Sequence, residues 1–259
     1  MKRCYVTTEQ VGEVLKKLQA FEASLYKTFD NFGYDLNDNL GRKNALLSQA
    51  QEKELAKVLK KEYGGDEVVV DGRPGQPDII IKCLKKELEC KLTSGHGKNK
   101  TFDLQTDYET LKRKGSLDYL YMLASPSFTK FCVLFFEGLT IADFHPPATG
   151  SRGKARMKKP NAMKKVKVLW GKSQNINIRM KKKWNSRLST LVDEKTKRIG
   201  ELNYRLKTTP SGAAQEQGKL ATLIRREEER YDKKIDAIIE KVEYWDKANE
   251  RFSFLLEKA

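Results

Sequence analysis

Long hydrophobic runs are missing from this sequence of 259 residues. The longest, residues 119–124 and 132–136, are far shorter than the roughly 20 residues that span a bilayer. The N-terminus has no apolar stretch of the secretory type, and the four cysteines include no Cys-x-x-Cys pair. We therefore expect no membrane partner and no disulfide or zinc scaffold, and we place the protein in the cytoplasm.

Acidic residues are absent between Phe144 and Val192, whereas the same window has 14 lysines and arginines. These 14 cations supply most of the net charge of +16. Such a concentrated basic block is typical of proteins that bind nucleic acid, and a solubilising segment is the alternative. In this block and in nearby loops we expect DNA contacts from Arg73, Lys98, Lys100, Arg152, Lys154, Arg156, Lys158, Lys159, Lys164, Lys165, Arg179, Lys181, Lys182 and Lys183.

Apolar periodicity in the first half predicts an α/β core with a central mixed sheet flanked by helices. Thr7 is a good cap for a first amphipathic helix, and Gly64 is a good stop for a second. The predicted helices and strands, in chain order, are a helix after Thr7, a helix at 43–62, strands at 67–71, 77–81 and 86–92, a helix at 102–114, and strands at 119–124 and 130–137.

The last third predicts a long antiparallel helical hairpin, because two amphipathic segments flank Pro210 and Gly212. The sequence thus divides into an α/β core at 1–145, a basic DNA-binding segment at 146–183 and the hairpin at 184–259. The hairpin is a DNA clamp or a dimerisation element, and its pattern leaves both alternatives open.

The charged residues that could bind a metal or take part in catalysis lie on the predicted strand pair. Glu89 and Lys91 alternate with apolar neighbours, so they share one face, which we expect to be polar. A short hairpin between the strands would bring Asp78 beside Glu89. Two carboxylates and an ammonium would then meet at one point, where the carboxylate oxygens suit Mg²⁺ and hydrolysis of a phosphodiester.

Pro77-Asp78, ten residues, and then Glu89-Cys90-Lys91 resemble the PD-(D/E)xK nuclease signature. Upstream, residues 51–55 resemble the helix that adds an acidic ligand in this superfamily, with Glu52 at the matching position and Glu54 as the alternative. Downstream, Gln105 is similar to the glutamine of a Gln-x-x-x-Tyr element on the helix after the motif, although the spacing here is one residue shorter. The resemblance covers about residues 43–137 and implies a restriction-endonuclease-like core.

The resemblance also implies roles for these residues. Asp78, Glu89, Lys91 and Glu52 would be catalytic, and the metal would be held by Asp78, Glu89, Glu52 and the carbonyl of Cys90. Gln105 would contact the nucleic acid. The cofactor would be Mg²⁺, with Mn²⁺ as a substitute, and no ATP is expected because the sequence has no Walker loop.

The implied function is site-specific cleavage of double-stranded DNA by a homodimer, as in Type II restriction enzymes, in a prokaryotic or viral host setting. A Holliday-junction resolvase, another structure-specific nuclease and a non-enzymatic basic nucleic-acid-binding protein are the alternatives.

Overall fold

The computed structural model describes residues 4–71, 73, 75–95, 102–150 and 153–259. The chain forms two units, one of Met1–Gln174 with Ser253–Ala259 and the other of Asn175–Phe252. These boundaries differ from the predicted ones at 145 and 183. The basic segment up to Gln174 is part of the first unit, because its strands pair with strands of the α/β core.

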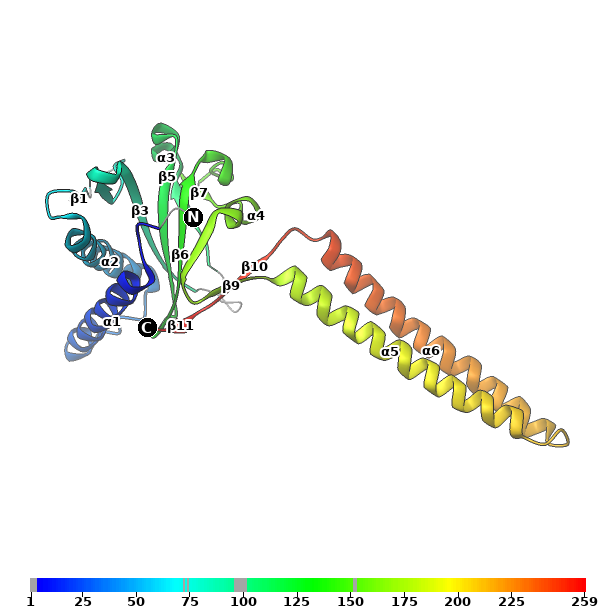
Figure 1. Ribbon diagram of the computed structural model, residues 1–259. Coiled ribbons are helices and arrows are strands. Elements are labelled where there is room, and N and C mark those ends of the chain that lie inside the picture. The colour runs from blue at the N-terminus through cyan, green and yellow to red at the C-terminus, as the bar shows by residue number, and fades with distance from the viewer. Residues whose placement is uncertain (1–3, 72, 74, 96–101, 151–152) are drawn as a thin grey trace. The chain divides into compact units, whose positions relative to one another are not determined.

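Two N-terminal helices, α1 (Thr8–Asn31) and α2 (Leu40–Tyr63), contact each other (Figure 1). The Thr7 side chain accepts a hydrogen bond from the backbone N–H of Gln10, whose side chain accepts one from the N–H of Thr7. This reciprocal cap fixes the start of α1 where the sequence predicted it. Gly64 ends α2 with a φ of 102°, a conformation that favours glycine.

A mixed sheet forms the centre of the first unit, as predicted. Strands β3 and β5 are parallel, and the other paired strands of this sheet are antiparallel. In the described part of the chain the sheet has seven strands in the order β1-β2-β3-β5-β6-β11, with β8 also paired to β6. Their bounds are β1 (Val68–Val70), β2 (Ile79–Ile81), β3 (Lys86–Ser94), β5 (Leu117–Ala124), β6 (Lys130–Leu139), β8 (Val166–Trp170) and β11 (Glu257–Lys258).

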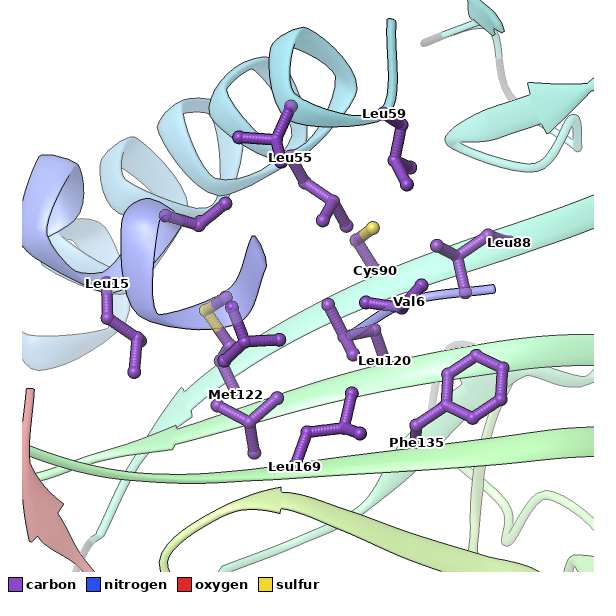
Figure 2. Close-up of a cluster of buried hydrophobic side chains, with 14 of the residues drawn as sticks. Val6, Leu15, Leu55, Leu59, Leu88, Cys90, Leu120, Met122, Phe135 and Leu169 are labelled. Atoms are coloured by element: carbon purple, nitrogen blue, oxygen red, sulfur yellow. The ribbon is translucent and has the colours of Figure 1, made fainter. Parts of the chain in front are cut away.

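Helices α1 and α2 cover one face of this sheet. Figure 2 shows Leu15 of α1 and Leu55 of α2 directed toward Cys90, Leu120 and Met122 of the strands. All five side chains are buried. The apolar stripes of both helices are therefore buried against the sheet, as their spacing predicted.

Shorter elements and an aromatic cluster lie on the other side of the strands, in part through a second, two-stranded sheet of β4 and β7. Tyr119 stacks on Tyr121 with ring centroids 5.7 Å apart, and Tyr121 meets Phe136 edge to face at 5.8 Å. The elements are β4 (Gln105–Asp107), α3 (Tyr108–Lys114), η2 (Ile141–Asp143), β7 (Lys154–Arg156), α4 (Lys159–Ala162) and η3 (Met163–Lys165), and a 3₁₀ turn η1 (Lys82–Leu84) joins β2 to β3.

The predicted helix at 102–114 is wrong over its first half. Residues 105–107 form β4, which pairs with β7 about 50 residues away in sequence. Helix α3 begins only after Asp107, whose Oδ1 accepts a hydrogen bond from the N–H of Thr110. Gln105 therefore lies on a strand and not on a helix, because a long-range strand partner outweighed the local helical pattern.

The second unit is the predicted helical hairpin of α5 (Ile176–Thr208) and α6 (Ala214–Lys247). The helices are antiparallel, since Lys181 pairs with Asp246 and Lys195 with Asp232 (Figure 1). Helix α5 begins at Ile176, after Asn175, whose side chain accepts a hydrogen bond from the N–H of Asn177. Strands β9 (Lys172–Asn175) and β10 (Phe252–Leu255) pair with each other where the chain passes between the units. Over the described residues, no helix is both long and apolar enough to span a membrane.

Candidate active site

Asp78 lies immediately before β2, and its carboxylate is bound to the neighbouring strand. Its Oδ2 accepts a hydrogen bond of 2.7 Å from the backbone N–H of Cys90. The pairing of Ile79 with Leu88 places Asp78 opposite Glu89 on β3. The strand pair therefore brings Asp78 and Glu89 together, as the short connection between the two strands predicted.

Glu89 and Lys91 lie two residues apart on β3 and form an ion pair between Glu89 Oε1 and Lys91 Nζ. The alternation of the sequence predicted that they share one polar face, and on that face Glu89 is only 7% exposed. The burial of Glu89 follows from the adjacent strand β5, which is buried along its whole length. Tyr119 of β5, the register partner of Glu89, is itself fully buried.

Glu52 of α2 is the helix carboxylate that interacts with this group. Its pKa responds to the charges of Asp78, Lys91 and Glu89. Glu54, the alternative, instead forms an ion pair with Lys57 at the surface. Helical geometry explains the difference, since residues two apart point to different sides of a helix. The structure thus gathers Glu52, Asp78, Glu89 and Lys91.

The crowding of carboxylates alters the acidity of each member. Burial, followed by the charges of Asp78 and Glu89, raises the pKa of Glu52 to about 7, although Lys91 opposes the rise. Burial likewise raises the pKa of Asp78 and of Glu89 above their ordinary values. Burial alone would lower the pKa of Lys91, but the Glu89 and Asp78 carboxylates outweigh it and raise that pKa. Lys91 is therefore a persistent cation among acids that readily hold a proton.

The donor set fits a hard divalent cation. Carboxylate oxygens are the ligands that Mg²⁺ prefers, and Mg²⁺ needs few of them from the protein. Glu89 Oε2 is buried and has no hydrogen-bond partner among the described residues, which is costly unless another group satisfies it. The Cys90 thiol lies in the apolar core, so only the backbone carbonyl of Cys90 remains as a ligand.

The predicted metal ligands are not drawn together into a ready site. Within the described ranges, no three His, Cys, Asp or Glu side chains are placed so that they could hold one ion. Glu89 is engaged with Lys91, and Asp78 with the Cys90 N–H. Asp78 and Glu89 lie opposite each other on the strand pair, and their charges act on Glu52.

A hollow of about 290 Å³ adjoins Lys91. Gln105 and Lys154 are among the residues that line it, so Gln105 lies near Lys91 although it is on a strand. The hydroxyl of Tyr121, another lining residue, donates a hydrogen bond of 2.9 Å to the Gln105 carbonyl. A larger hollow, about 650 Å³, lies at the turn between α1 and α2. It is lined by none of Glu52, Asp78, Glu89 and Lys91. We call the smaller hollow the cleft, because Lys91 lines it.

Asp103, Asp107 and Tyr121 belong to this region and were not singled out from the sequence. Asp103 and Tyr121 line the cleft, and the charge of Asp107 contributes to the raised pKa of Glu89. Asp107 could have been found as a helix cap, since Thr110 follows three residues later. Asp103 and Tyr121 carry no local signal and are brought there by the pairing of distant strands.

The predicted DNA-binding residues of the first unit differ in their availability. Lys154 and Lys164 are exposed, and Lys158 is half-buried. Three other predicted residues form ion pairs. Arg73 pairs with Asp71, Arg156 with Asp103, and Lys165 with Asp143. Lys98, Lys100 and Arg152 lie outside the described residues.

Lys159 is a poor candidate for a phosphate contact. Its Nζ donates a hydrogen bond of 2.9 Å to the carbonyl of Phe102 and lies 5.6 Å from the ring centroid of Phe254. Burial lowers the pKa of this ammonium group. The prediction for Lys159 is corrected accordingly, since its side chain ties α4 to neighbouring segments.

The remaining predicted cations, Arg179, Lys181, Lys182 and Lys183, belong to α5 in the second unit. Lys182 and Lys183 are exposed, and Lys181 is paired with Asp246. The basic block is therefore shared between the two units, although it is continuous in sequence.

No family model matches the chain, and neither the curated proteins nor the solved structures contain a match to it.

Proposed function

We propose that this protein is a magnesium-dependent endonuclease with a restriction-endonuclease-like core of the PD-(D/E)xK type. The observation that carries the proposal is the convergence of Asp78, Glu89 and Lys91 across one strand pair, with Glu52 beside them. Helix α2, the antiparallel strand pair of β2 and β3, and the later helix α3 follow in the order that the resemblance implies. Three acids around one persistent cation suit hydrolysis of a phosphodiester.

Each residue has a distinct task in this proposal. Asp78, fixed through Oδ2 by the Cys90 N–H, keeps Oδ1 for a cation, and Glu89 offers its unsatisfied Oε2. Mg²⁺, when bound there, would neutralise charge on the phosphodiester and activate water. Glu52, with a pKa of about 7, holds or releases a proton near neutrality.

Lys91 acts through its positive charge. Because Glu89 and Asp78 raise its pKa, its Nζ keeps the proton at neutral pH. It therefore donates a hydrogen bond to a phosphate oxygen or to the attacking water, and it does not serve as the base.

The proposed substrate is double-stranded DNA, cut at specific sites as by a Type II restriction enzyme. The net charge of +16 and the exposed cations of both units support a polyanionic substrate. Cutting both strands needs two active sites, so we propose that two copies act as a symmetric homodimer.

Incubation of supercoiled plasmid with Mg²⁺, with Mn²⁺ or with EDTA tests the activity, and Asp78→Asn tests the site. Asparagine can still accept the Cys90 N–H, so the fold should persist while the charge is lost. We expect cleavage to fall by more than about a hundredfold. The matched control is Glu87→Gln, since Glu87 lies on the same strand and pairs with Lys114 outside this group.

The products separate the alternatives. Discrete fragments indicate a site-specific enzyme, and a smear indicates non-specific cleavage. Preferential cutting of a four-way junction indicates a resolvase. Plasmid that stays supercoiled with either metal would contradict the proposal and favour a non-enzymatic nucleic-acid-binding protein. Full activity of Asp78→Asn would refute the active-site assignment.

A further inference from the structure

The two ends of the helical hairpin differ in charge. Residues 176–187 and 241–251 together contain eight cations and three acids, and the first of these segments has no acid, whereas residues 188–240 contain 11 cations and 10 acids. Net charge in the second unit is thus concentrated at the start of α5. We call this end the hairpin base and define it as residues 176–187 of α5 with residues 241–251.

The two segments of the hairpin base are in direct contact (Figure 1). The backbone N–H of Ile176 donates a hydrogen bond of 2.8 Å to the carbonyl of Arg251. The side chain of Asn177, which is buried, accepts from the N–H of Arg251 at 2.9 Å and donates to the carbonyl of Ala248 at 3.1 Å. The end of α6 is therefore held beside the cations that open α5.

Aromatic rings lie among these cations. Tyr244 is 52% exposed, and its ring meets that of Trp245 edge to face at 5.3 Å. The guanidinium of Arg251 lies 5.7 Å from the Trp245 ring centroid and donates a hydrogen bond of 3.2 Å to the Tyr244 hydroxyl. Across the hairpin, Lys241 lies 4.5 Å from the ring centroid of Trp184.

The acids of this region are largely neutralised. Asp246 is paired with Lys181, and Glu243 with Lys247. Lys182 and Lys183 are exposed and have no acidic partner among the described residues. The cation that lies beside the exposed Tyr244 ring is Arg251, which donates to its hydroxyl, and the two lysines add positive charge on the facing helix.

We infer that the hairpin base is a binding surface for unpaired nucleotides, in which a base stacks on Tyr244 and the neighbouring cations contact phosphates. A stacked base needs an exposed aromatic face, and its phosphate needs a nearby cation. Tyr244 and Arg251 meet both needs. Bases inside a duplex are already stacked on each other, so they cannot stack on Tyr244. The inference goes beyond the proposed nuclease activity and concerns binding without metal, so either can fail while the other stands.

The test measures binding of the full chain to fluorescent oligo(dT) in EDTA by anisotropy. Tyr244→Ala should weaken binding by roughly five- to a hundredfold. The matched control is Tyr204→Ala, because Tyr204 is 70% exposed on the same hairpin but lies near its far end. This control should change affinity less than about twofold. Tyr244→Phe keeps the ring and should bind like the wild type.

Three results would overturn the inference. Equal affinity of the Tyr204→Ala and Tyr244→Ala proteins would show that no base stacks on Tyr244. Weak binding by Tyr244→Phe would show that the hydroxyl acts instead of the ring. Equal losses for oligo(dT) and for a duplex, or for polyglutamate, would indicate contacts to backbone charge or an acidic protein partner. A normal far-ultraviolet circular dichroism spectrum checks that each variant is folded.

Discussion

In the α/β unit four charged side chains are buried and each meets a specific partner, whereas in the helical hairpin the charged side chains stay at the surface. Lys43, Glu89, Asp118 and Asp143 are all buried in the first unit. Within Asn175–Phe252, which the structure describes completely, Asn177 is the one buried polar residue. The first unit has enough depth to exclude water from an ion pair, and two packed helices do not.

This difference has consequences for function. A buried carboxylate changes its pKa and is held in place, as catalysis requires. An exposed cation on a helix is accessible to a flexible polyanion. We therefore assign chemistry to the α/β unit and a share of the DNA affinity to the hairpin, and the following experiments challenge that division.

The largest expected effect concerns DNA affinity and salt. If both units together neutralise about six to ten phosphates, affinity should fall by about 10³ to 10⁵ between about 50 and 200 mM salt. Replacing residues 177–250 with a short Gly/Ser linker should keep the first unit folded, because the Ile176 N–H and the Arg251 carbonyl are already joined. The salt slope should then shrink by roughly 0.9 for each phosphate that the hairpin neutralises in the intact protein.

Filter binding across a salt series measures this slope. An unchanged slope would mean that the hairpin makes no phosphate contacts. A flat slope in the intact protein would mean that the basic block is not at the DNA interface at all.

The next effect concerns the buried ammonium of Lys43, which is 1% exposed. Its Nζ donates to Glu22, to Asn37 Oδ1 at 2.8 Å and to the Pro126 carbonyl at 3.1 Å. Lys43→Ala should destabilise the first unit by about 3–5 kcal/mol, because the Glu22 carboxylate loses its partner. Lys57→Ala, which removes an exposed pair, should change stability by less than about 1 kcal/mol.

Urea unfolding with hydrogen exchange resolved by segment measures the free energy of unfolding of each unit. Protection of α5 and α6 should not change in Lys43→Ala. A parallel loss of protection in both units would show that they unfold as one and would contradict the division.

A smaller effect is expected at Gly171, after β8, where φ is 71°. A Cβ there would lie 2.6 Å from the Leu255 carbonyl oxygen and 2.9 Å from that of Phe131. Gly171→Ala should therefore cost about 2–5 kcal/mol through strain and overpacking. Gly138→Ala, with a φ of 65° but no atom within 4 Å of the new Cβ, should cost only about 1–2 kcal/mol.

Thermal unfolding of the two glycine variants compares them directly. A larger loss at Gly171 means that the C-terminal segment is part of the core of the first unit. Equal losses would mean that the C-terminal segment can shift away from Gly171 at little cost.

The smallest effect is the pH dependence at Glu52. Its pKa is about 7 in the folded protein, above the ordinary value of 4.5, so the folded state binds the proton more tightly. The resulting stability is fully present below about pH 4.5 and is lost as pH rises through about 7. In EDTA, Glu52→Gln should hence become more stable than the wild type at pH 8 and should match it near pH 4.5.

Melting temperatures across this pH range test the sign, and Glu54→Gln is the control on the same helix. A constant difference between Glu52→Gln and wild type at all pH values would mean that the pKa of Glu52 is not raised.

Much of the candidate site could be predicted from the sequence because it depends on local geometry. Alternation along β3 puts Glu89 and Lys91 on one side, and a short connection brings Asp78 to the adjacent strand. The capped start of α1 and the apolar stripes of the helices are equally local. These features follow from residues within about 15 positions of each other, so chain order alone specifies them.

The tertiary structure decided what lies beyond that range. The burial of Glu89 depends on Tyr119 of the adjacent strand. Which of Glu52 and Glu54 faces the strands depends on how α2 packs. Gln105 is part of a strand because its segment pairs with β7. The C-terminal strand β11 pairs with β6, although the hairpin separates it in sequence from the rest of its unit. The sequence by itself determined which charged groups are available and their order. The tertiary structure decided which of these groups are shielded from solvent, because burial requires distant segments to pack over them. The buried groups are the ones whose pKa values change and that are suited to catalysis.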